Sequence, residues 1–314
     1  MIIRNKTITI FGGTGFLGRY VVKELADLGC RINVVTRNQE KAADLKVGLS
    51  LGQLNIIQGD VTDSQFVESI VQQSDILINL IGCLFERHIG EFAKLHAQFP
   101  ELLAQLAKKH QLLQLIHISA LGVGLNEYSL YAATKLSGEN AIKENFDNHV
   151  ILRPSVMFGH EDHFINQFAN ISAISPIIPL LLGGRMKFQP VYVHDIARAI
   201  AKIVQTDKYN ERIYEIGGPN IYTMRKMTEM ILDILQQKRL LVSIPLKLSL
   251  LLGNILGRFP NPKLTSDQVK MLMADNVTQS NSATFYDLSV QPQSLDDLLP
   301  ELLTRHQNPS YHNS

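Results

Sequence analysis

A β-branched strand leads into a glycine-rich turn at Thr7-Ile8-Thr9-Ile10-Phe11-Gly12-Gly13-Thr14-Gly15-Phe16-Leu17-Gly18. Glycines at positions 12, 15 and 18 permit a tight turn, a close approach of backbone N–H groups to a pyrophosphate, and close packing of the next helix on the strand. An ordinary glycine-rich loop is the alternative, but the helical period of residues 20–25 favours a dinucleotide site. We therefore predict cofactor contacts from Gly12, Gly13, Thr14, Gly15, Phe16, Leu17 and Gly18.

The residues after the second predicted strand, 31–36, indicate which dinucleotide binds. A site for NAD(H) usually carries Asp or Glu here, where the carboxylate accepts a hydrogen bond from the ribose 2′-hydroxyl. This chain has Arg37 and Asn38 at that point, with Lys41 close behind. Because a guanidinium can bind a 2′-phosphate through two hydrogen bonds, Arg37 and Asn38 predict NADP(H) rather than NAD(H). A solvated arginine at a strand end is the alternative.

The composition argues against several classes of function. The 314 residues are 45% hydrophobic and 19% charged, which is ordinary for a globular protein. A formal net charge of +1 gives no basis for a nucleic-acid surface. Cys30 and Cys83 lie in apolar contexts, so buried thiols are expected rather than a disulfide. His160 and His163 flank two acids, but without a distant third ligand we expect no metal site.

Predicted strands alternate with helical stretches, which is the pattern of a parallel sheet wound on both faces. We therefore predict an α/β fold with a Rossmann-type doubly wound domain over residues 1–154. A smaller, mostly helical C-terminal lobe over 155–305 is expected to intertwine with it, followed by a flexible tail over 306–314. Further strands are predicted at 54–58, 75–80, 112–118 and 150–152, with long helices at 92–110 and 131–144. The lobe is expected to hold helices at 165–171, 194–204 and 224–235 and a strand at 213–216.

Loops after these strands should also line the cofactor site, because ligands bind at the carboxyl ends of parallel strands. Asp60 is placed to meet the adenine, although capping of the next helix by Asp60 or Asp63 is the alternative. The other loop residues expected at the cofactor are Val61, Leu80, Ile81, Gly82 and Pro154.

Three side chains near the fifth strand carry the predicted chemistry. Ser119 follows the strand, and Tyr131 and Lys135 lie four residues apart, on one face of the next helix. In that arrangement the ammonium can lower the pKa of the phenol and hold the nicotinamide ribose, while the phenol exchanges a proton and the serine polarises a carbonyl. A solvated lysine beside a packed tyrosine is the alternative. Tyr222 and Lys226 repeat the spacing, but nothing around them supports a role.

The glycine turn, Ser119, Tyr131 and Lys135 together resemble the extended or atypical branch of the short-chain dehydrogenase/reductase superfamily, which includes the epimerase/dehydratase type. The stretches 151–164, 189–197 and 264–269 are similar to the NADP(H)-binding accessory subunit of respiratory complex I (NADH:ubiquinone oxidoreductase) and its bacterial relatives. The resemblance covers residues 5–280. One departure is His96, on the helix where many short-chain dehydrogenases place an asparagine; it could relay protons or simply be packed.

The resemblance implies a tightly held, structural NADP(H) and contacts with complex I subunits or the membrane surface. The alternative that it leaves open is an active NADPH-dependent reductase or epimerase-type enzyme on a hydrophobic carbonyl, quinone-like or lipid-like substrate. Because the first strand begins within ten residues of the start, we expect a cytoplasmic protein on the inner face of the inner membrane. If the chain is already processed, the mitochondrial matrix is expected instead.

The stretch 240–257 is almost continuously apolar but is interrupted by Pro245, Lys247 and Asn254. Its uninterrupted part is too short to cross a bilayer. A buried helix is one interpretation. The other is an outward apolar surface for a membrane, a lipid-like ligand or a partner, because a lysine and an asparagine are unfavourable in a fully buried helix.

Overall fold

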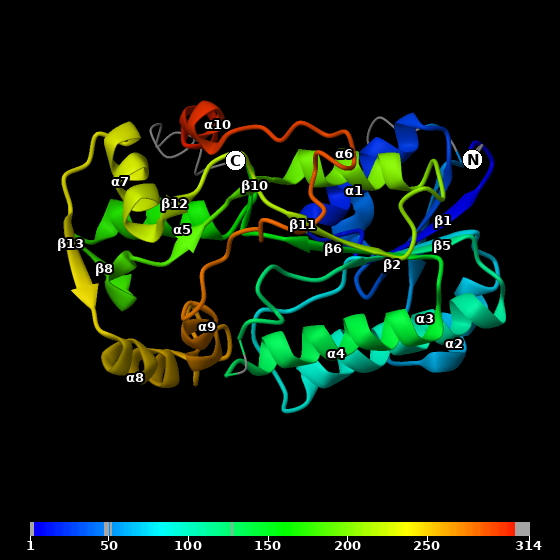
Figure 1. The fold of residues 1–314 in the computed structure, drawn as a ribbon, viewed down its shortest axis with the longest axis horizontal. Helices are drawn as coiled ribbons and strands as arrows, with labels where there is room; N and C mark the ends of the chain where they lie inside the picture. Colours follow the sequence, from blue (N-terminus) through cyan, green and yellow to red (C-terminus); the bar gives the residue numbers. More distant parts are fainter. Residues whose placement is uncertain (1–2, 47–49, 51, 127, 305–314) are drawn as a thin grey trace.

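A computed structural model describes residues 3–46, 50, 52–126 and 128–304 of the chain. Its centre is a seven-stranded sheet in the order β11-β6-β5-β4-β1-β2-β3, in which every neighbouring pair is parallel (Figure 1). The strand order reverses between β1 and β4, and this is where open α/β sheets bind ligands. The strands are β1 (Thr7–Phe11), β2 (Arg31–Thr36), β3 (Leu54–Gln58), β4 (Ile76–Asn79), β5 (Gln114–Ile118), β6 (His149–Pro154) and β11 (Arg212–Ile216).

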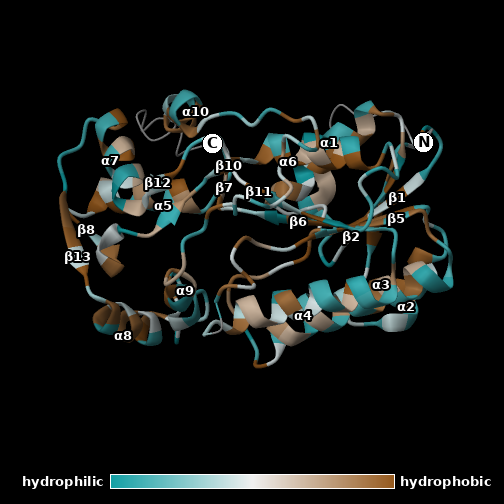
Figure 2. Cartoon of the chain, in the orientation of Figure 1, coloured by the Kyte–Doolittle hydropathy of each residue, from teal (hydrophilic) through white to brown (hydrophobic). Residues whose placement is uncertain are grey.

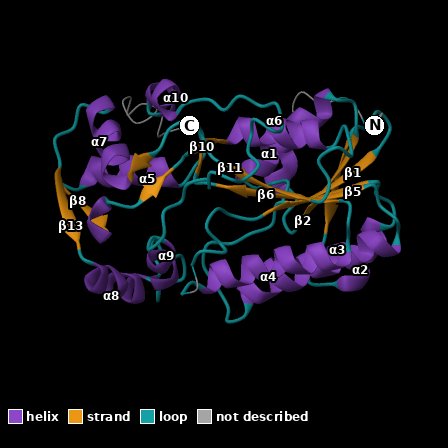
Figure 3. Cartoon of the chain, in the orientation of Figure 1, coloured by secondary structure: helices purple, strands orange, loops and turns teal. Residues whose placement is uncertain are grey.

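Helices cover both faces of this sheet, which confirms the predicted doubly wound α/β class (Figure 3). On one face, helices α1 (Phe16–Asp27) and α6 (Val193–Ile203) share an apolar core with Ile8 and Ile10 of β1. On the other face, Phe11 of β1 packs in a second apolar core. The helices that cover this second face are α2 (Ser64–Val71), α3 (Phe99–Lys109) and α4 (Leu130–Asn145). A 3-10 helix, Glu40–Lys46, follows β2. Successive side chains of a strand point to opposite faces of the sheet, so each strand contributes to both apolar cores.

The helix predicted at 92–110 is not regular. Residues Ala93–Gln98 form a π-helical turn, and α3 begins only at Phe99. A Cβ atom on Gly138 of α4 would lie 2.0 Å from the carbonyl oxygen of His96, so only glycine permits this approach. The widened turn and the glycine together bring α4 against the segment that carries His96. Such π turns are frequent at functional sites.

The smaller lobe has its own apolar core, built around Phe158, Leu180 and Leu299. Three short strand pairs brace it: β7 (Met157–Phe158) with β10 (Val191–Tyr192), β8 (Ile177–Leu181) with β13 (Leu240–Ile244), and β9 (Lys187–Phe188) with β12 (Tyr222–Thr223). A short 3-10 turn, Leu182–Gly184, follows β8. Its helices are α5 (Phe164–Ile174), α7 (Met224–Ile234), α8 (Leu246–Leu256), α9 (Ser266–Met271) and α10 (Leu295–Leu302).

Two segments that the sequence assigned to the smaller lobe, strand β11 and helix α6, pack with the large sheet domain instead. Strand β11 pairs with β6 along its whole length, from Arg212 opposite Val150 to Ile216 opposite Pro154. Helix α6 packs on α1 and forms the crossover that a parallel pair requires. The lobe is therefore intertwined with the sheet, since residues after 154 leave it and then return. The tail predicted at 306–314 lies outside the described residues.

Across the described residues, no helix has both the length and the apolar character needed to span a bilayer.

Candidate functional site

The glycine turn after β1 has the geometry that its spacing predicts. Gly12 has a φ of +86°, and a Cβ atom there would lie 3.1 Å from the carbonyl carbon of Leu80. A Cβ atom on Gly18 would lie only 2.5 Å from the carbonyl oxygen of Gly12. The turn closes through a hydrogen bond of 3.0 Å from the Gly15 N–H to the Gly12 carbonyl. Glycine is therefore needed both for the backbone conformation and for the close contact with α1.

A groove of about 450 Å³ runs from this turn across the carboxyl ends of β1, β2 and β4. Helix α1 begins beside it, with Gly15 as N-cap, no side chain capping its N–H groups, and no acid in its first turn. An uncapped helix N-terminus facing a groove is a ready anion site. The predicted residues that line the groove are Gly12, Thr14, Gly15, Arg37, Asn38, Asp60, Val61, Leu80, Ile81 and Gly82.

Other residues expected at the cofactor contact protein rather than the groove. A Cβ on Gly13 would meet the Val34 side chain at 2.9 Å, and Leu17 is buried in the core under α1. Phe16 packs edge-on against Tyr20, with 6.0 Å between ring centroids. The carbonyl of Pro154 accepts a hydrogen bond from Leu121. These residues, together with Gly18, shape the turn and the sheet edge behind the groove.

Arg37 is exposed at the end of β2, on the same groove as Asp60. A hydrogen bond from the Thr62 N–H, and to a smaller extent the Arg37 guanidinium, hold the pKa of Asp60 below its usual range. Asp63, not Asp60, caps α2, because its carboxylate accepts from the N–H groups of Gln65 and Phe66. Asp60 therefore lines the groove, and its contact with the adenine stays a prediction.

Lys135 reaches from α4 to the carboxyl ends of two strands. Its Nζ donates to the Ile118 carbonyl at 2.9 Å and to the Ile81 carbonyl at 3.5 Å. Ser119 directly follows β5 and is buried, and its Oγ has no hydrogen-bond partner among the described residues. Tyr131 lies one helical turn before Lys135 and is 7% exposed. A buried hydroxyl that lacks a hydrogen-bond partner is a reason to expect a ligand at Ser119.

Burial, not the neighbouring lysine, dominates the electrostatics of Tyr131. Desolvation and the Cys83 thiol raise the pKa of Tyr131 well above its usual range, so the expected lowering by Lys135 is wrong for this structure. Burial also lowers the pKa of Lys135 to about 8, although Cys83 and Glu139 oppose that shift. At neutral pH the phenol is therefore protonated and the amine is mostly charged. This state suits proton donation rather than proton abstraction.

His96 is a packed, neutral histidine. Its Nε2 accepts a hydrogen bond of 3.1 Å from the Cys83 N–H, and its ring stacks on Phe92 with 5.1 Å between centroids. Nδ1 lies 3.4 Å from the Thr134 hydroxyl. Burial, with the charge of Lys135, lowers the pKa of His96 to about 3. Of the two alternatives drawn from the sequence, the structure therefore favours packing over a proton relay.

Cys83 is a groove residue that the sequence did not identify as functional. Cys30 is buried as expected, but Cys83 is only half-buried and lines the groove next to Gly82. Its Sγ lies 3.8 Å from His96 Nε2. Burial, and then the charge of Glu91, raise the pKa of Cys83 to about 11, so the group remains a thiol. Its position directly after Leu80-Ile81-Gly82 was the available signal.

Asp267 of α9 is the second residue that the sequence did not identify. Its carboxylate accepts hydrogen bonds from the Leu130 N–H at 2.7 Å, the Ser129 hydroxyl at 2.8 Å and the Tyr131 N–H at 3.1 Å. An acid at a helix N-terminus also stabilises the helix dipole. The smaller lobe thereby fixes the start of the helix that carries Tyr131. No local pattern could have revealed this contact, since the partners lie about 137 residues apart.

Replacing Asp267 with alanine is expected to lower the free energy of unfolding by about 2 kcal/mol, because three donors lose their acceptor. The mobility of Tyr131 should rise as well. Thermal unfolding and amide hydrogen exchange at the start of α4 would measure the two effects. Asp297→Ala, on the exposed first turn of α10, is the matched control and should change neither. Equal stability of the two variants would contradict the proposed capping role.

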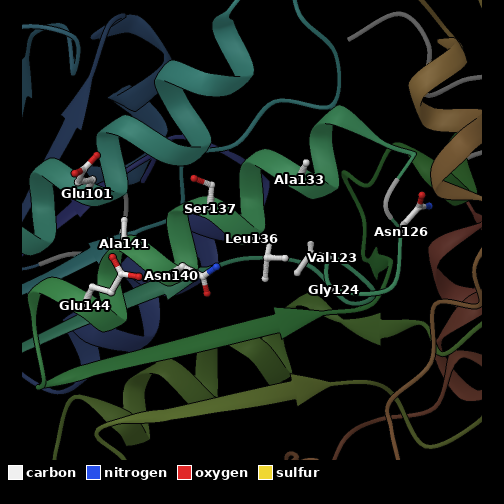
Figure 4. A pocket seen from close by; sticks show the side chains of 10 residues that line it. All are labelled: Glu101, Val123, Gly124, Asn126, Ala133, Leu136, Ser137, Asn140, Ala141 and Glu144. Carbon is white, nitrogen blue, oxygen red and sulfur yellow. The ribbon is translucent and has the colours of Figure 1, made fainter.

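Two other features lie apart from this groove. A hollow of about 650 Å³ runs along α4 near Ala133, Ser137 and Asn140, and it contains none of the predicted site residues (Figure 4). His160 lies 3.7 Å from Glu301, in an ion pair if the histidine is protonated. In the described part of the chain, no group of three or more His, Cys, Asp or Glu residues is arranged to hold a metal ion.

Comparison with known proteins assigns the chain to a family. The family model described as NAD dependent epimerase/dehydratase matches residues 8–217, which include the glycine turn, Ser119, Tyr131 and Lys135. The chain belongs to the NAD-dependent epimerase/dehydratase family. This is an NAD(P)-binding family of short-chain dehydrogenase/reductase type, as the motifs predicted.

Two relatives of this chain carry the same printed name, NADH dehydrogenase (ubiquinone) 1 alpha subcomplex subunit 9, mitochondrial. The protein of Arabidopsis thaliana is 30% identical over 310 residues, covering 95% of this chain and 77% of the relative. The protein of Mus musculus is 31% identical over 300 residues, covering 95% and 80%. The chain is thus homologous to complex I accessory subunits, which confirms the resemblance drawn from its sequence.

Solved structures show the same fold. An NADPH-dependent quinone oxidoreductase of Escherichia coli, complexed with NADPH, superposes with a TM-score of 0.75 at 16% identity, over 95% of this chain and 100% of that one. The dTDP-glucose 4,6-dehydratase DesIV of Streptomyces venezuelae, with NAD bound, gives 0.71 at 19% identity, over 98% and 99%. These likenesses establish the fold and leave the choice between NAD and NADP to the residues of the groove.

Proposed function

We propose that this protein is an NADP(H)-binding accessory subunit of a respiratory complex I. The observation that carries the proposal is the groove: an uncapped helix N-terminus at Gly15 and a cation, Arg37, at the end of β2. Identities of 30–31% over about 95% of the chain to mitochondrial complex I subunits support the partner. The accompanying location is peripheral, on the inner face of the inner membrane or, for a processed chain, in the mitochondrial matrix.

The residues of the groove fit a dinucleotide from end to end. Gly12 and Gly15 leave room for a pyrophosphate, and Arg37 with Asn38 would bind the 2′-phosphate. Asp60 and Val61 would border the adenine. At the other end Lys135 lies 3.3 Å from the Cβ position of Gly82, so its Nζ is close to the groove lining where a nicotinamide ribose would lie. The protein would hold the cofactor chiefly to stabilise its own fold.

A second function rests on a different observation: Lys135 Nζ donates to the Ile118 carbonyl at the end of β5, directly before Ser119, and Tyr131 lies one helical turn before Lys135. This chemistry is reduction of a hydrophobic carbonyl, with a bound NADPH supplying the hydride. Ser119 Oγ, which has no partner among the described residues, would donate a hydrogen bond to the carbonyl oxygen. Tyr131, protonated because of its raised pKa, would donate the proton. A ceramide reductase of Caulobacter vibrioides is 25% identical over 63% of this chain.

One purification separates these two functions. The protein is isolated from its own cells in mild detergent, and the co-purifying chains and bound nucleotide are identified by mass spectrometry. Complex I chains together with stoichiometric NADP(H) would support the accessory role. Recovery as a free protein without those chains would overturn that role, and rapid oxidation of bound NADPH by an apolar carbonyl would establish the reductase.

Replacing Arg37 with glutamate tests the choice of cofactor. The native protein should bind NADPH at least about tenfold more tightly than NADH, because a charged hydrogen-bonded pair contributes about 1.5–3 kcal/mol. The variant should lose or invert that preference, since its carboxylate repels the phosphate and accepts from a free hydroxyl. Calorimetric titration with both nucleotides measures the ratio. Arg31→Glu, at the opposite end of β2, is the control, and equal native affinities for both nucleotides would refute the assignment.

A further inference from the structure

Helix α8 of the smaller lobe buries small residues and exposes large apolar ones, unlike an ordinary surface helix. The two buried residues of α8 are both small: Ser249 and Gly253. Several of its apolar residues are exposed instead: Leu248 is 42% exposed, Leu251 53% and Ile255 50%, while the other leucines except Leu256 are half-buried. A surface helix of a globular protein normally turns its apolar stripe toward the core. Figure 2 shows α8 at one end of the molecule, coloured largely brown for its hydrophobic residues.

The packing of α8 explains why the small residues point inward. A Cβ on Gly253 would lie 2.8 Å from the Ser266 N–H nitrogen, so α8 rests directly on the start of α9. The Ser249 hydroxyl lies 3.3 Å from the Ile244 carbonyl and 3.5 Å from the Leu182 N–H nitrogen. These contacts hold the helix in one rotation about its axis. The outward leucines are therefore a fixed property of the folded lobe.

One exposed basic residue lies at each end of this apolar helix, and acids are missing from the same stretch of sequence. Residues 234–266 contain no Asp or Glu, although the whole chain carries 29 acids against 30 Lys and Arg. Lys247 at the start of α8 and Arg258 just after its end are both exposed, and Phe259 beside Arg258 is 61% exposed. The basic residues in the stretch are Lys238, Arg239, Lys247, Arg258 and Lys263. Apolar side chains between cations fit an anionic lipid surface.

We propose that α8 binds an anionic lipid bilayer, lying in the plane of the interface with Leu248, Leu251 and Ile255 among the acyl chains. Lys247 and Arg258 would then meet lipid phosphates, and their aliphatic stems would cover the apolar boundary. The inference deepens the peripheral location proposed above and rests on it for the cellular setting. A second copy of this chain is a poor occupant of the face, because a symmetric contact would bring like charges together.

Vesicle flotation with the full-length protein tests the proposal. Vesicles of phosphatidylcholine alone are compared with vesicles containing phosphatidylglycerol at one part in four, at low and high salt. We expect binding to the anionic vesicles that weakens as salt rises. Leu251→Glu should reduce that binding by about tenfold or more, because it places a carboxylate where apolar area would be buried. Lys247→Gln, which removes one cation, should reduce it by about fivefold.

Ile221→Glu is the matched control for Leu251→Glu. Ile221 is 55% exposed, close to the 53% of Leu251, and the neighbouring Asn220 bonds to the start of α10, on the other side of the lobe from α8 (Figure 1). This variant should bind anionic vesicles as the native protein does. Both glutamate variants should keep native thermal unfolding and NADPH binding. If Leu251→Glu does not fold, Lys247→Gln provides the same test.

Two results would overturn the proposal: no binding of the native protein to anionic vesicles, or equal binding by the native protein, Leu251→Glu and Lys247→Gln. If the native protein co-purifies with complex I but does not bind protein-free vesicles, a protein covers α8 and only the lipid inference fails. If it binds vesicles but co-purifies with no complex I chain, the proposed function fails and the lipid surface stands.

Discussion

Gly15→Val is expected to abolish dinucleotide binding, with an affinity loss of at least about a hundredfold. Gly15 lies in the groove at the start of α1, and a Cβ atom there already approaches the Gly12 carbonyl oxygen to 3.2 Å. A branched side chain would fill the space in which a pyrophosphate meets the helix N-terminus, so the phosphates would lose their N–H donors. Calorimetric titration with NADPH would measure the affinity, and gel filtration would show whether nucleotide is retained.

The same variant also tests whether the cofactor stabilises the fold. A ligand that binds only the native state raises the melting temperature by mass action, so Gly15→Val should remove the gain that NADPH gives the native protein. Gly124→Val is the matched control, because no atom lies within 4 Å of its added Cβ and it does not line the groove. A Gly15→Val protein that still carries NADPH after gel filtration would contradict the phosphate site.

Tyr131→Phe is expected to lower turnover of a carbonyl substrate by about 10²–10⁴, if the protein is a reductase, while NADPH binding stays nearly native. The variant removes the proton donor but keeps the ring that packs against His96 and Phe92. The native rate should also fall above about pH 8, where Lys135 loses its charge. Tyr131 itself should not limit the rate in this range, because burial raises its pKa above 10. Stopped-flow oxidation of bound NADPH would measure these rates.

Tyr222→Phe is the control for this variant, because Tyr222 and Lys226 repeat the same sequence spacing. Tyr222 lies on β12, and its hydroxyl donates to Asp296 of the smaller lobe instead of facing the groove. We expect native turnover from it. If no carbonyl oxidises the bound NADPH of the native protein, the reductase proposal fails and a structural cofactor remains.

Local sequence patterns were sufficient to predict much of the fold and the glycine turn at one end of the groove. The strands predicted at 31–36 and 54–58 have those bounds in the structure, because strand formation there follows from β-branched runs ended by turn residues. The glycine spacing also predicted the positive φ of Gly12 and the close approach at Gly18. These features depend on neighbours a few residues away, which the sequence contains in full.

Other features depend on segments that meet only in the folded chain. The sequence could not place β11 beside β6, since part of the smaller lobe and helix α6 are inserted between them. It also assigned a lowered pKa to Tyr131, because the helical spacing shows Lys135 but not the burial that outweighs it. Asp267 reaches Tyr131 from another lobe.

The apolar stretch at 240–257 shows the division between sequence and tertiary structure within one segment. Its composition alone established an apolar segment with nearby cations and no acids, too short to cross a bilayer. Which side is exposed on the protein was decided by the contact of Gly253 with Ser266, which fixes the rotation of α8. Composition determines what a helix can bury, but the neighbour on which it packs determines which face remains exposed.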